Sequence, residues 1–351
     1  MEKIAILGAG VMGSAVTWPL TDNGYDVHLI GTHLDDAIIS SCKSKRYHPR
    51  LERKIPDRVT PFFIDDLDQA LEDVSFIVSG VNSMGVNWIG KKLAPYVKKS
   101  TRIIAITKGL EVDGEGNLVI LPEVMRSELP ENVRDAVSIA AVGGPCIAGE
   151  LAGRRQSCVY FGARELETVV DLKKFFKTDY YHVWTTDDIV SLELAVALKN
   201  AYAFGVGIAD GILERAGGVD SSGAYMHNLK AALFARGCLE MHTLLAAQGA
   251  NGAFAYNLPG VGDLFVTSTG GRSVTLGRLI GAGLNYEDAS ARLSGETLEA
   301  ALVIQQMGKA LPALYRKNVI EMGDVPFMDL LVDIVVHNKL AELNLDAFFG
   351  I

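Results

Sequence analysis

The feature that most constrains this chain is a glycine-rich segment that directly follows a short apolar run. Residues 4–15 read Ile-Ala-Ile-Leu-Gly-Ala-Gly-Val-Met-Gly-Ser-Ala, with glycines at Gly8, Gly10 and Gly13. Gly8 permits the tight turn from a strand into a helix, Gly10 lets the backbone approach a pyrophosphate, and Gly13 lets the helix pack closely on the strand. Because a helix that begins here points free N–H groups at phosphates, the segment favours a nicotinamide or flavin dinucleotide site over a simple glycine-rich turn.

The acidic residue that usually accompanies this motif, about 20 residues further on, is missing. The second apolar run ends in Gly31, and Thr32 and His33 follow where an acid would bind the adenosine ribose. Asp35 and Asp36 come slightly late and are expected to cap the next helix. Since Thr32 and His33 can tolerate a 2′-phosphate, both NAD and NADP stay open as the cofactor.

Short apolar runs separated by helix-like segments continue through the first half of the chain. This alternation is typical of βαβ units and predicts an α/β fold with a doubly wound, mostly parallel sheet. Ligands bind such sheets at the carboxyl ends of the strands. The expected strands are Lys3–Leu7, Tyr25–Ile30, Phe76–Ser79, Arg102–Thr107, Val137–Ala141, Cys158–Phe161 and Tyr181–Trp184, and the expected helices between them include Gly13–Asn23 and Arg164–Phe176.

After Asp187 the pattern changes to helices without a strong strand. A chain of 351 residues is expected to form about two domains. We therefore predict a dinucleotide-binding Rossmann domain over residues 1–186 and an all-helical substrate domain over residues 187–351. The expected helices are Ile189–Ile212, Ala224–Gln248, Ser273–Ala282, Tyr286–Leu293, Thr297–Gly308 and the tail Leu311–Leu343.

Charge and composition limit the partners of this chain. The formal net charge of −9 argues against nucleic acid or an anionic membrane surface as a partner, because a protein that binds either one needs clustered cations. It does not exclude a small phosphorylated substrate, which one Arg and one Lys can hold. The uncharged stretch Met241–Gly262 contains Pro259 and several polar residues, so no membrane span is expected there.

The four cysteines are widely separated and form no C-x-x-C pair. A metal site and a disulfide framework are therefore not expected, and the thiols suit a reducing compartment. The apolar residues near the start of the sequence are expected to form a structural strand rather than the apolar region of a signal peptide. These features predict a cytoplasmic protein, and a homodimer is the default expectation for its assembly.

Lys199 is unusual for its surroundings. It lies in a helical pattern over residues 189–209 in which only Glu193 and Lys199 carry charge. A helix that is apolar nearly all round is buried, and a buried ammonium is costly unless a carboxylate pairs with it. Such a Lys is a candidate proton donor, although a Lys can also extend its amine from the helix to solvent. Asp263, a lone charge among glycines and apolar residues, is the candidate partner.

Three further segments carry candidate ligand contacts. Lys108 follows an apolar run, so it is expected at the carboxyl end of a strand, unless it is a solvated loop residue. Gly143-Gly144-Pro145 follows the next run, where glycines allow close approach to a ligand. Arg272 and Ser273 open a helix after two glycines, which suits an anion-binding loop, although Ser273 equally suits a plain helix cap.

Taken together, these segments resemble the NAD(P)-dependent glycerol-3-phosphate dehydrogenase family. They occur in the family's order and with similar spacing over nearly the whole chain. The matching segments are Gly8-x-Gly10-x-x-Gly13, Lys108-Gly109, Gly144-Pro145-x-x-Ala148-x-Glu150, Leu198-Lys199-Asn200, Gly262-Asp263-Leu264-x-x-Thr267 and Arg272.

The resemblance implies reversible reduction of dihydroxyacetone phosphate to sn-glycerol 3-phosphate at a site between the two domains. It implies that Lys199 transfers the proton, that Lys108 helps polarise the same oxygen, and that Asp263 orients Lys199. The implied substrate contacts are Asn200, Thr267, Arg272 and Ser273. The implied cofactor contacts are Gly8, Gly10, Val11, Met12, Gly13, Thr32, His33, Lys108, Ala148 and Arg272.

The chain departs from the family pattern at several places. It has Arg272-Ser273 where the family usually has Arg-Asn, and Met12 where an aromatic residue is common. After Glu150 the family tends to have a small residue followed by Pro-Thr, whereas this chain has a run that contains Arg154 and Arg155. These differences bear on the substrate more than on the reaction type. Three alternatives therefore stay open: a dehydrogenase of another polyol phosphate, a 3-hydroxyacid or ketopantoate-type reductase, and a non-catalytic dinucleotide-binding redox sensor.

Overall fold

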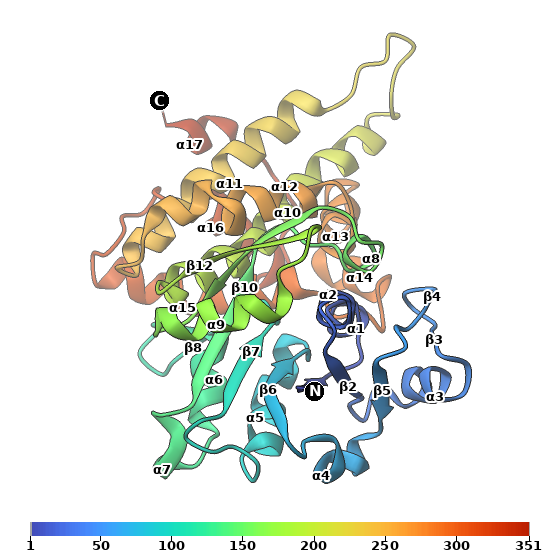
Figure 1. Cartoon of the computed structure of the whole chain (residues 1–351). Helices are drawn as coiled ribbons and strands as arrows, with labels where there is room; N and C mark the ends of the chain where they lie inside the picture. Colours follow the sequence, from blue (N-terminus) through green and yellow to red (C-terminus); the bar gives the residue numbers. More distant parts are fainter. Residues whose placement is uncertain (1, 351) are drawn as a thin grey trace. The chain divides into compact units, whose positions relative to one another are not determined.

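The apolar runs of the first half pair into one mostly parallel sheet in the computed structural model, which describes residues 2–350 (Figure 1). The strand order is β12-β11-β10-β7-β6-β1-β2-β5, and β10 with β11 is the antiparallel pair in it. The chain therefore winds outward from β1 on both sides, which confirms the predicted doubly wound sheet. The strands are β1 (Lys3–Leu7), β2 (Asp26–Ile30), β5 (Val59–Phe62), β6 (Val74–Ser79), β7 (Arg102–Ala105), β10 (Ser138–Gly143), β11 (Ser157–Gly162) and β12 (Tyr181–Thr186).

Strand β5 is absent from the strands predicted above. It reads Val-Thr-Pro-Phe, and a Pro inside a short run argues against a strand because Pro cannot donate a ladder hydrogen bond. In the structure β5 is an edge strand that pairs only with β2, with Pro61 opposite Leu29. An edge position tolerates Pro, which is why the local pattern misled the prediction.

Helices cover both faces of the sheet, because alternate residues of the central strands point to opposite sides. Ile4 and Ile6 of β1 belong to one buried core, while Ala5 and Leu7 belong to the other. The first core is covered by α1 (Val11–Ala15), α2 (Thr17–Asp22), α3 (Asp36–Lys45), α8 (Ala148–Ala152) and α9 (Leu166–Phe176). The second is covered by α4 (Leu67–Ala70), α5 (Val86–Leu93), α6 (Leu121–Ser127) and the adjoining α7 (Glu131–Arg134).

The single helix predicted over residues 13–23 is instead two short helices. Helix α1 ends at Ala15 and α2 begins at Thr17, with Val16 between them. Pro19 lies in the first turn of α2 and has no N–H to donate to the carbonyl of Ala15. The interruption therefore falls where the proline removes a helical hydrogen bond.

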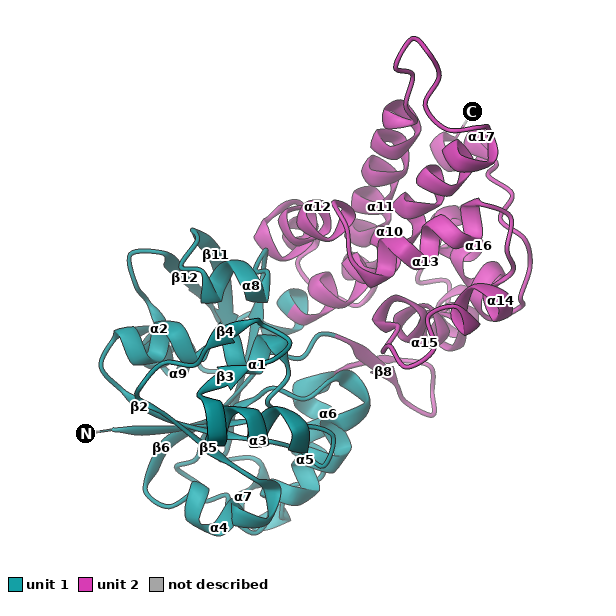
Figure 2. Cartoon of the chain, turned by 90° about the vertical axis from the view of Figure 1, so that its right-hand side faces the viewer, with its two compact units in different colours: residues 1–108, 121–192 teal, residues 109–120, 193–351 magenta. Residues whose placement is uncertain are grey.

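The chain divides into two compact units, coloured separately in Figure 2. Unit 1 consists of Met1–Lys108 and Leu121–Leu192, and unit 2 of Gly109–Ile120 and Glu193–Ile351. The division at Leu192 lies inside the long helix Ile189–Arg215, and the domain boundary near residue 186 stays a prediction. The segment 109–120 belongs to unit 2 although its neighbours on both sides belong to unit 1.

Segment 109–120 is a β-hairpin formed by β8 (Leu110–Val112) and β9 (Leu118–Ile120). It packs on helix α15 of the same unit (Glu299–Arg316). Gln306 donates to Glu111 at 3.0 Å and Lys317 donates to Asn117 at 2.9 Å. These contacts join residues about two hundred positions apart, so no local pattern indicates them.

Residues 193–350 form helices joined by loops, as the sequence predicts. The helices are α10 (Ile189–Arg215), α11 (His227–Ala247), α12 (Asp263–Ser268), α13 (Arg272–Gly281), α14 (Tyr286–Ala291), α15, α16 (Pro326–Val335) and α17 (Leu345–Phe349), with a 3₁₀ segment over Gly252–Tyr256 and a π-helical turn over Leu258–Gly262. The predicted tail helix over 311–343 is wrong, because α15 continues through Pro312 to Arg316 and the chain turns before α16.

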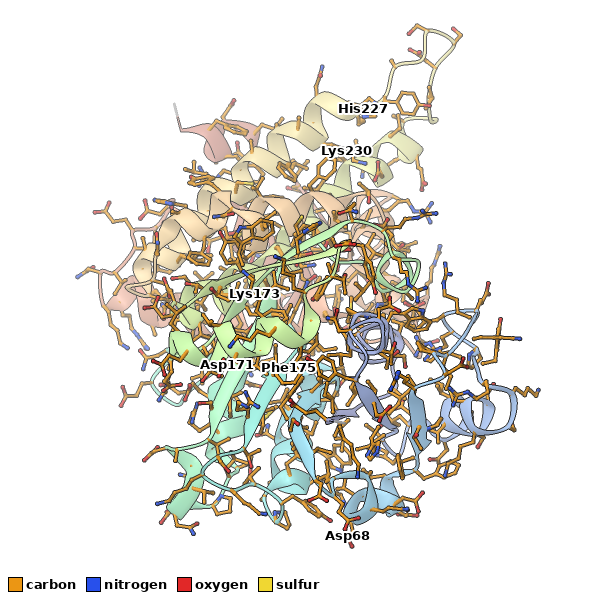
Figure 3. The ribbon with its side chains drawn as sticks, in the orientation of Figure 1. Asp68, Asp171, Lys173, Phe175, His227 and Lys230 are labelled. Carbon is orange, nitrogen blue, oxygen red and sulfur yellow. The ribbon has the colours of Figure 1, made fainter. Side chains whose placement is uncertain are left out.

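Helix α10 is the central helix of unit 2. It has the length and apolar composition of a membrane-crossing helix, but 94% of its apolar window is buried inside the structure, as expected of a core helix. It runs beside α11, and Lys230 of α11 pairs with Asp210 of α10 at 2.9 Å. Figure 3 shows Lys230 and His227 near the start of α11, where His227 stacks on Tyr225 of the connecting loop.

Candidate functional site

The glycine-rich segment forms a tight turn between β1 and α1 in unit 1. Gly8 has a φ of +117°, and a Cβ there would lie 2.6 Å from the Gly80 backbone. A Cβ on Gly13 would lie 2.1 Å from the carbonyl oxygen of Gly8. A Cβ on Gly10, by contrast, would meet no atom of the described residues within 4 Å. The protein's own packing therefore accounts for Gly8 and Gly13, whereas Gly10 faces open space at the start of α1, which fits a bound pyrophosphate.

This difference makes Gly10 a selective test of cofactor binding. Its φ of −64° and ψ of 174° suit any L residue, so Gly10→Val is expected to leave the melting temperature nearly unchanged. The added side chain would occupy the space for the pyrophosphate and raise the dissociation constant for NADH or NADPH at least about tenfold, about 1.4 kcal/mol. Fluorescence titration measures the change, with Gly114→Val, at a similarly open position, as the control. Unchanged affinity in Gly10→Val would contradict the assignment.

In the loop after β2, Asp35 does not have the helix-capping role that the sequence predicts. Asp35 precedes α3, but its side chain does not cap that helix. Its Oδ2 instead accepts hydrogen bonds from Thr32 N and Thr32 Oγ1, at 2.9 and 2.8 Å, and from Ala9 N at 3.2 Å. The predicted cap is therefore wrong. Thr32 is buried with its hydroxyl toward Asp35, while His33 is exposed with its ring 5.4 Å from that of Trp88.

Lys108 and the Gly143–Pro145 turn lie together at the carboxyl ends of β7 and β10. The Nζ of Lys108 is 3.4 Å from the carbonyl oxygen of Gly144, whose φ is +132°. Ala148 begins α8 and belongs to the same buried core as Ala9, against which Val11 and Met12 also pack. The structure thus brings the predicted cofactor contacts Val11, Met12 and Ala148 into one region of unit 1.

Lys199 and Asp263 meet in unit 2, as the sequence predicts. Their side chains are almost completely buried, and Lys199 Nζ lies 3.1 Å from Asp263 Oδ1. Lys199 Nζ also donates to Thr267 Oγ1 at 2.6 Å, and Thr267 Oγ1 lies 3.4 Å from Asp263 Oδ1. Asp263 and Thr267 are one turn apart on α12, so they present both oxygens from one helix face. The carboxylate and the hydroxyl fix the direction in which the ammonium points.

Asn200 follows Lys199 on α10 and is 3% exposed. Its Nδ2 has no hydrogen-bond partner within residues 2–350. A buried amide donor without a partner costs about 1–3 kcal/mol, so it indicates a position that a ligand oxygen can fill. Asn200 thus supplies a buried hydrogen-bond donor one residue after Lys199 on α10.

Arg272 is the first residue of α13 and is partly exposed. Its Nη2 lies 3.6 Å from Glu299 Oε1, a loose ion pair at the surface of unit 2. Helix α13 approaches α10 very closely, because a Cβ on Gly277 would lie 2.0 Å from the carbonyl oxygen of Phe204. This packing fixes the start of α13, with Arg272 and Ser273, relative to the helix that carries Lys199.

Two residues that contact the glycine-rich turn were not predicted as contributors to this site. His48 Nε2 lies 3.0 Å from the carbonyl oxygen of Ala9, and Asp35 accepts from the N–H of the same residue. His48 lies in a short hairpin strand, β3 (Tyr47–His48), after α3. No motif spacing connects it with the turn, and its complete burial is a property of the folded chain.

Comparison with known proteins places these features in a family. The family description "NAD-dependent glycerol-3-phosphate dehydrogenase N-terminus" matches residues 3–169, and the corresponding C-terminus description matches residues 188–344. The chain is 34% identical to the NADP(+)-dependent glycerol-3-phosphate dehydrogenase of Archaeoglobus fulgidus over 83% of both chains. It is 33% identical to the glycerol-3-phosphate dehydrogenase [NAD(P)+] of Bacillus velezensis, over 82% of this chain and 79% of that one.

The fold gives the same result. The crystal structure of glycerol-3-phosphate dehydrogenase from Coxiella burnetii has a TM-score of 0.80 and 26% identity, and the alignment covers 99% of this chain and 98% of that one. The two family matches together span most of the sequence and both structural units. The chain therefore belongs to the NAD-dependent glycerol-3-phosphate dehydrogenase family.

Proposed function

We propose that this protein catalyses the reversible reduction of dihydroxyacetone phosphate to sn-glycerol 3-phosphate with NADH or NADPH. The observation that carries the proposal is the buried Lys199 ammonium, held by Asp263 and Thr267. The next residue on α10, Asn200, adds a buried amide Nδ2 that has no partner within residues 2–350. A dinucleotide-binding sensor would need the glycine-rich turn but not this group of residues. Membership of the family supports the same activity.

In the proposed reaction, a dinucleotide bound at the glycine-rich turn would supply the hydride for the carbonyl carbon. Lys199 donates a proton to the carbonyl oxygen as negative charge develops there, and it takes the proton back in the oxidation. Asp263 and Thr267 hold the ammonium in one orientation, so little reorganisation is needed during the reaction. Asn200 donates a second hydrogen bond to a substrate oxygen. The role predicted for Lys108, to polarise the reacting oxygen, stays a prediction.

Arg272 is the proposed contact for the substrate phosphate. Its ion pair with Glu299 is loose and partly exposed, so the guanidinium can exchange the carboxylate for a phosphate at low cost. An Arg at the start of a helix also benefits from the N–H groups and the dipole that face the same anion. Ser273, the next residue of α13, is proposed to assist through its hydroxyl.

Arg272→Ala is therefore expected to raise the KM for dihydroxyacetone phosphate by about 10 to 100-fold, because a charge-assisted hydrogen bond contributes about 1.5–3 kcal/mol. The dissociation constant for NADH or NADPH should change little. Arg278→Ala is the matched control, since Arg278 lies on the same helix in an exposed pair with Glu214. If Arg272→Ala weakens cofactor binding and leaves the substrate KM unchanged, the assignment to the substrate phosphate is wrong.

The activity itself is tested by following the absorbance of NADH and NADPH with several phosphorylated and unphosphorylated ketones. We expect oxidation with dihydroxyacetone phosphate and much slower oxidation with ketones that lack the phosphate. A preference for a longer keto-phosphate would indicate another polyol phosphate, and a preference for an unphosphorylated keto acid would indicate the ketopantoate-type alternative. If the protein binds the cofactor but oxidises it with none of the ketones, the result would favour the non-catalytic dinucleotide-binding sensor.

The relatives named above carry both NADP and NAD(P) in their names, so both cofactors belong in this assay. The homodimer and the cytoplasmic location stay predictions from the sequence.

A further inference from the structure

Ala9, between the first two glycines of the turn, is held at both of its polar backbone atoms by side chains from outside the motif. Its N–H donates to Asp35 Oδ2 at 3.2 Å. Its carbonyl oxygen lies 3.0 Å from His48 Nε2. The two side chains are 26 and 39 residues away along the sequence. The peptide groups on either side of Ala9 are therefore fixed by tertiary contacts rather than by the turn alone.

The Asp35 contact is buried and specific. Asp35 is 9% exposed, and the oxygen that receives Ala9 N also receives the N–H and the hydroxyl of Thr32. One carboxylate oxygen thus links the loop after β2 to the loop after β1. Gly31 allows the start of α3 to pack closely here, because a Cβ there would lie 2.5 Å from Ile39 Cγ1 and 3.2 Å from Asp35 Cβ. The Asp35 carboxylate therefore accepts hydrogen bonds from the protein's own backbone rather than from a ribose hydroxyl.

The direction of the His48 contact follows from its other nitrogen. His48 is fully buried, and its Nδ1 lies 3.0 Å from Leu51 N, which can only donate. Nδ1 must then be an acceptor, so Nε2 carries the proton and donates to Ala9 O. Burial holds the pKa of His48 below its ordinary value, which favours this neutral form. Ser14 Oγ gives the same carbonyl a second donor at 3.2 Å.

We propose that Asp35 and His48 are positioning residues that fix Ala9, and through it Gly10 and the start of α1, in the arrangement that receives the cofactor's pyrophosphate. Gly10 follows Ala9 directly and precedes the first residue of α1. Turning the Ala9–Gly10 peptide would turn the N–H groups away from the phosphates. A turn held in place before binding avoids the free energy of ordering it during binding. This inference rests on the proposed function, because it requires that the turn binds NAD(P).

The test compares disruptive and conservative variants at both positions in the full-length protein without substrate. Asp35→Ala and His48→Leu remove the contacts to Ala9, while Asp35→Asn and His48→Gln keep an acceptor and a donor of similar reach. Dissociation constants for NADH and NADPH are measured by fluorescence titration, and thermal melts report the fold. His28→Gln and Asp22→Asn are matched controls in the same unit: His28 contacts the carbonyl of Ala70, and Asp22 pairs with Arg154.

We expect the two disruptive variants to raise the dissociation constant about tenfold. The conservative variants should stay within about threefold and the controls within about twofold of the parent. The KM for dihydroxyacetone phosphate should change little in all of them.

A merely structural role would lower the melting temperature and leave the affinity of the folded protein unchanged, and that result would overturn the inference. The same holds if neither disruptive variant folds, because the two residues then serve the fold itself. If the parent binds neither cofactor, the proposed function fails instead.

Discussion

Replacing Lys199 by Met in an Asp263→Asn background is expected to lower kcat by about 10² to 10⁴-fold, the usual contribution of a positioned proton donor. The double change is preferable to Lys199→Met alone. Asp263 is 3% exposed, and a carboxylate left there without its ammonium would destabilise the protein by several kcal/mol. With both charges removed, the loss of rate reports the chemistry rather than the fold. The dissociation constant for NADH or NADPH should be unchanged.

Lys230 and Asp210 provide a matched control for this experiment. They form an ion pair at 2.9 Å between helices of the same unit, but both side chains are more than a quarter exposed. Lys230→Met with Asp210→Asn removes the same two charges and is expected to change kcat by less than about twofold, because an exposed pair contributes about 0–1 kcal/mol to stability. A kcat within tenfold of the parent for the Lys199 and Asp263 double variant would show that the buried pair does not transfer the proton.

Glu240→Ala is expected to lower the free energy of unfolding of unit 2 by about 3–5 kcal/mol, the largest effect on stability that we predict. Glu240 is fully buried on α11 and accepts hydrogen bonds from four donors. Arg236 Nε and the N–H of Phe327 bind Oε1, both at 2.7 Å. The N–H of Met328 and the hydroxyl of Tyr202 bind Oε2, at 2.8 and 3.1 Å.

The reason for the large effect is the number of groups left without a partner. Phe327 and Met328 lie in the first turn of α16, where N–H groups have no acceptor within the helix. Alanine would leave them, Tyr202 and the Arg236 guanidinium buried without Glu240. Thermal unfolding should show a drop in Tm of about 10 °C.

Glu214→Ala is the matched control for the Glu240 experiment. Glu214 also pairs with an arginine, Arg278 at 3.0 Å, but about half of each side chain is exposed. Its removal should change the stability by no more than about 1 kcal/mol. Equal shifts in Tm for the two alanine variants would contradict the structural role assigned to Glu240.

The sequence predicted most of the sheet because its strands are short apolar runs whose partners follow in regular βαβ order. It also predicted the meeting of Lys199 and Asp263, since two lone charges in apolar surroundings each require a partner. It misjudged Asp35, because an Asp before a helix usually caps it, whereas here the carboxylate turns to Ala9. It also missed the continuation of α15 through Pro312, where packing against the rest of unit 2 outweighs the lost hydrogen bond.

Local residue patterns specify the glycine-rich turn, the apolar strands and the apolar helix around Lys199. The order of the family's motifs is likewise visible in the sequence. These features can be read along the chain because turn geometry and burial depend mainly on neighbouring residues. The assignment of hairpin 109–120 to unit 2, the four donors around Glu240 and the hold of Asp35 and His48 on Ala9 depend on contacts between segments far apart in the chain. Only folding creates those contacts, because a buried polar atom finds its partner wherever the packed elements bring one within hydrogen-bond distance.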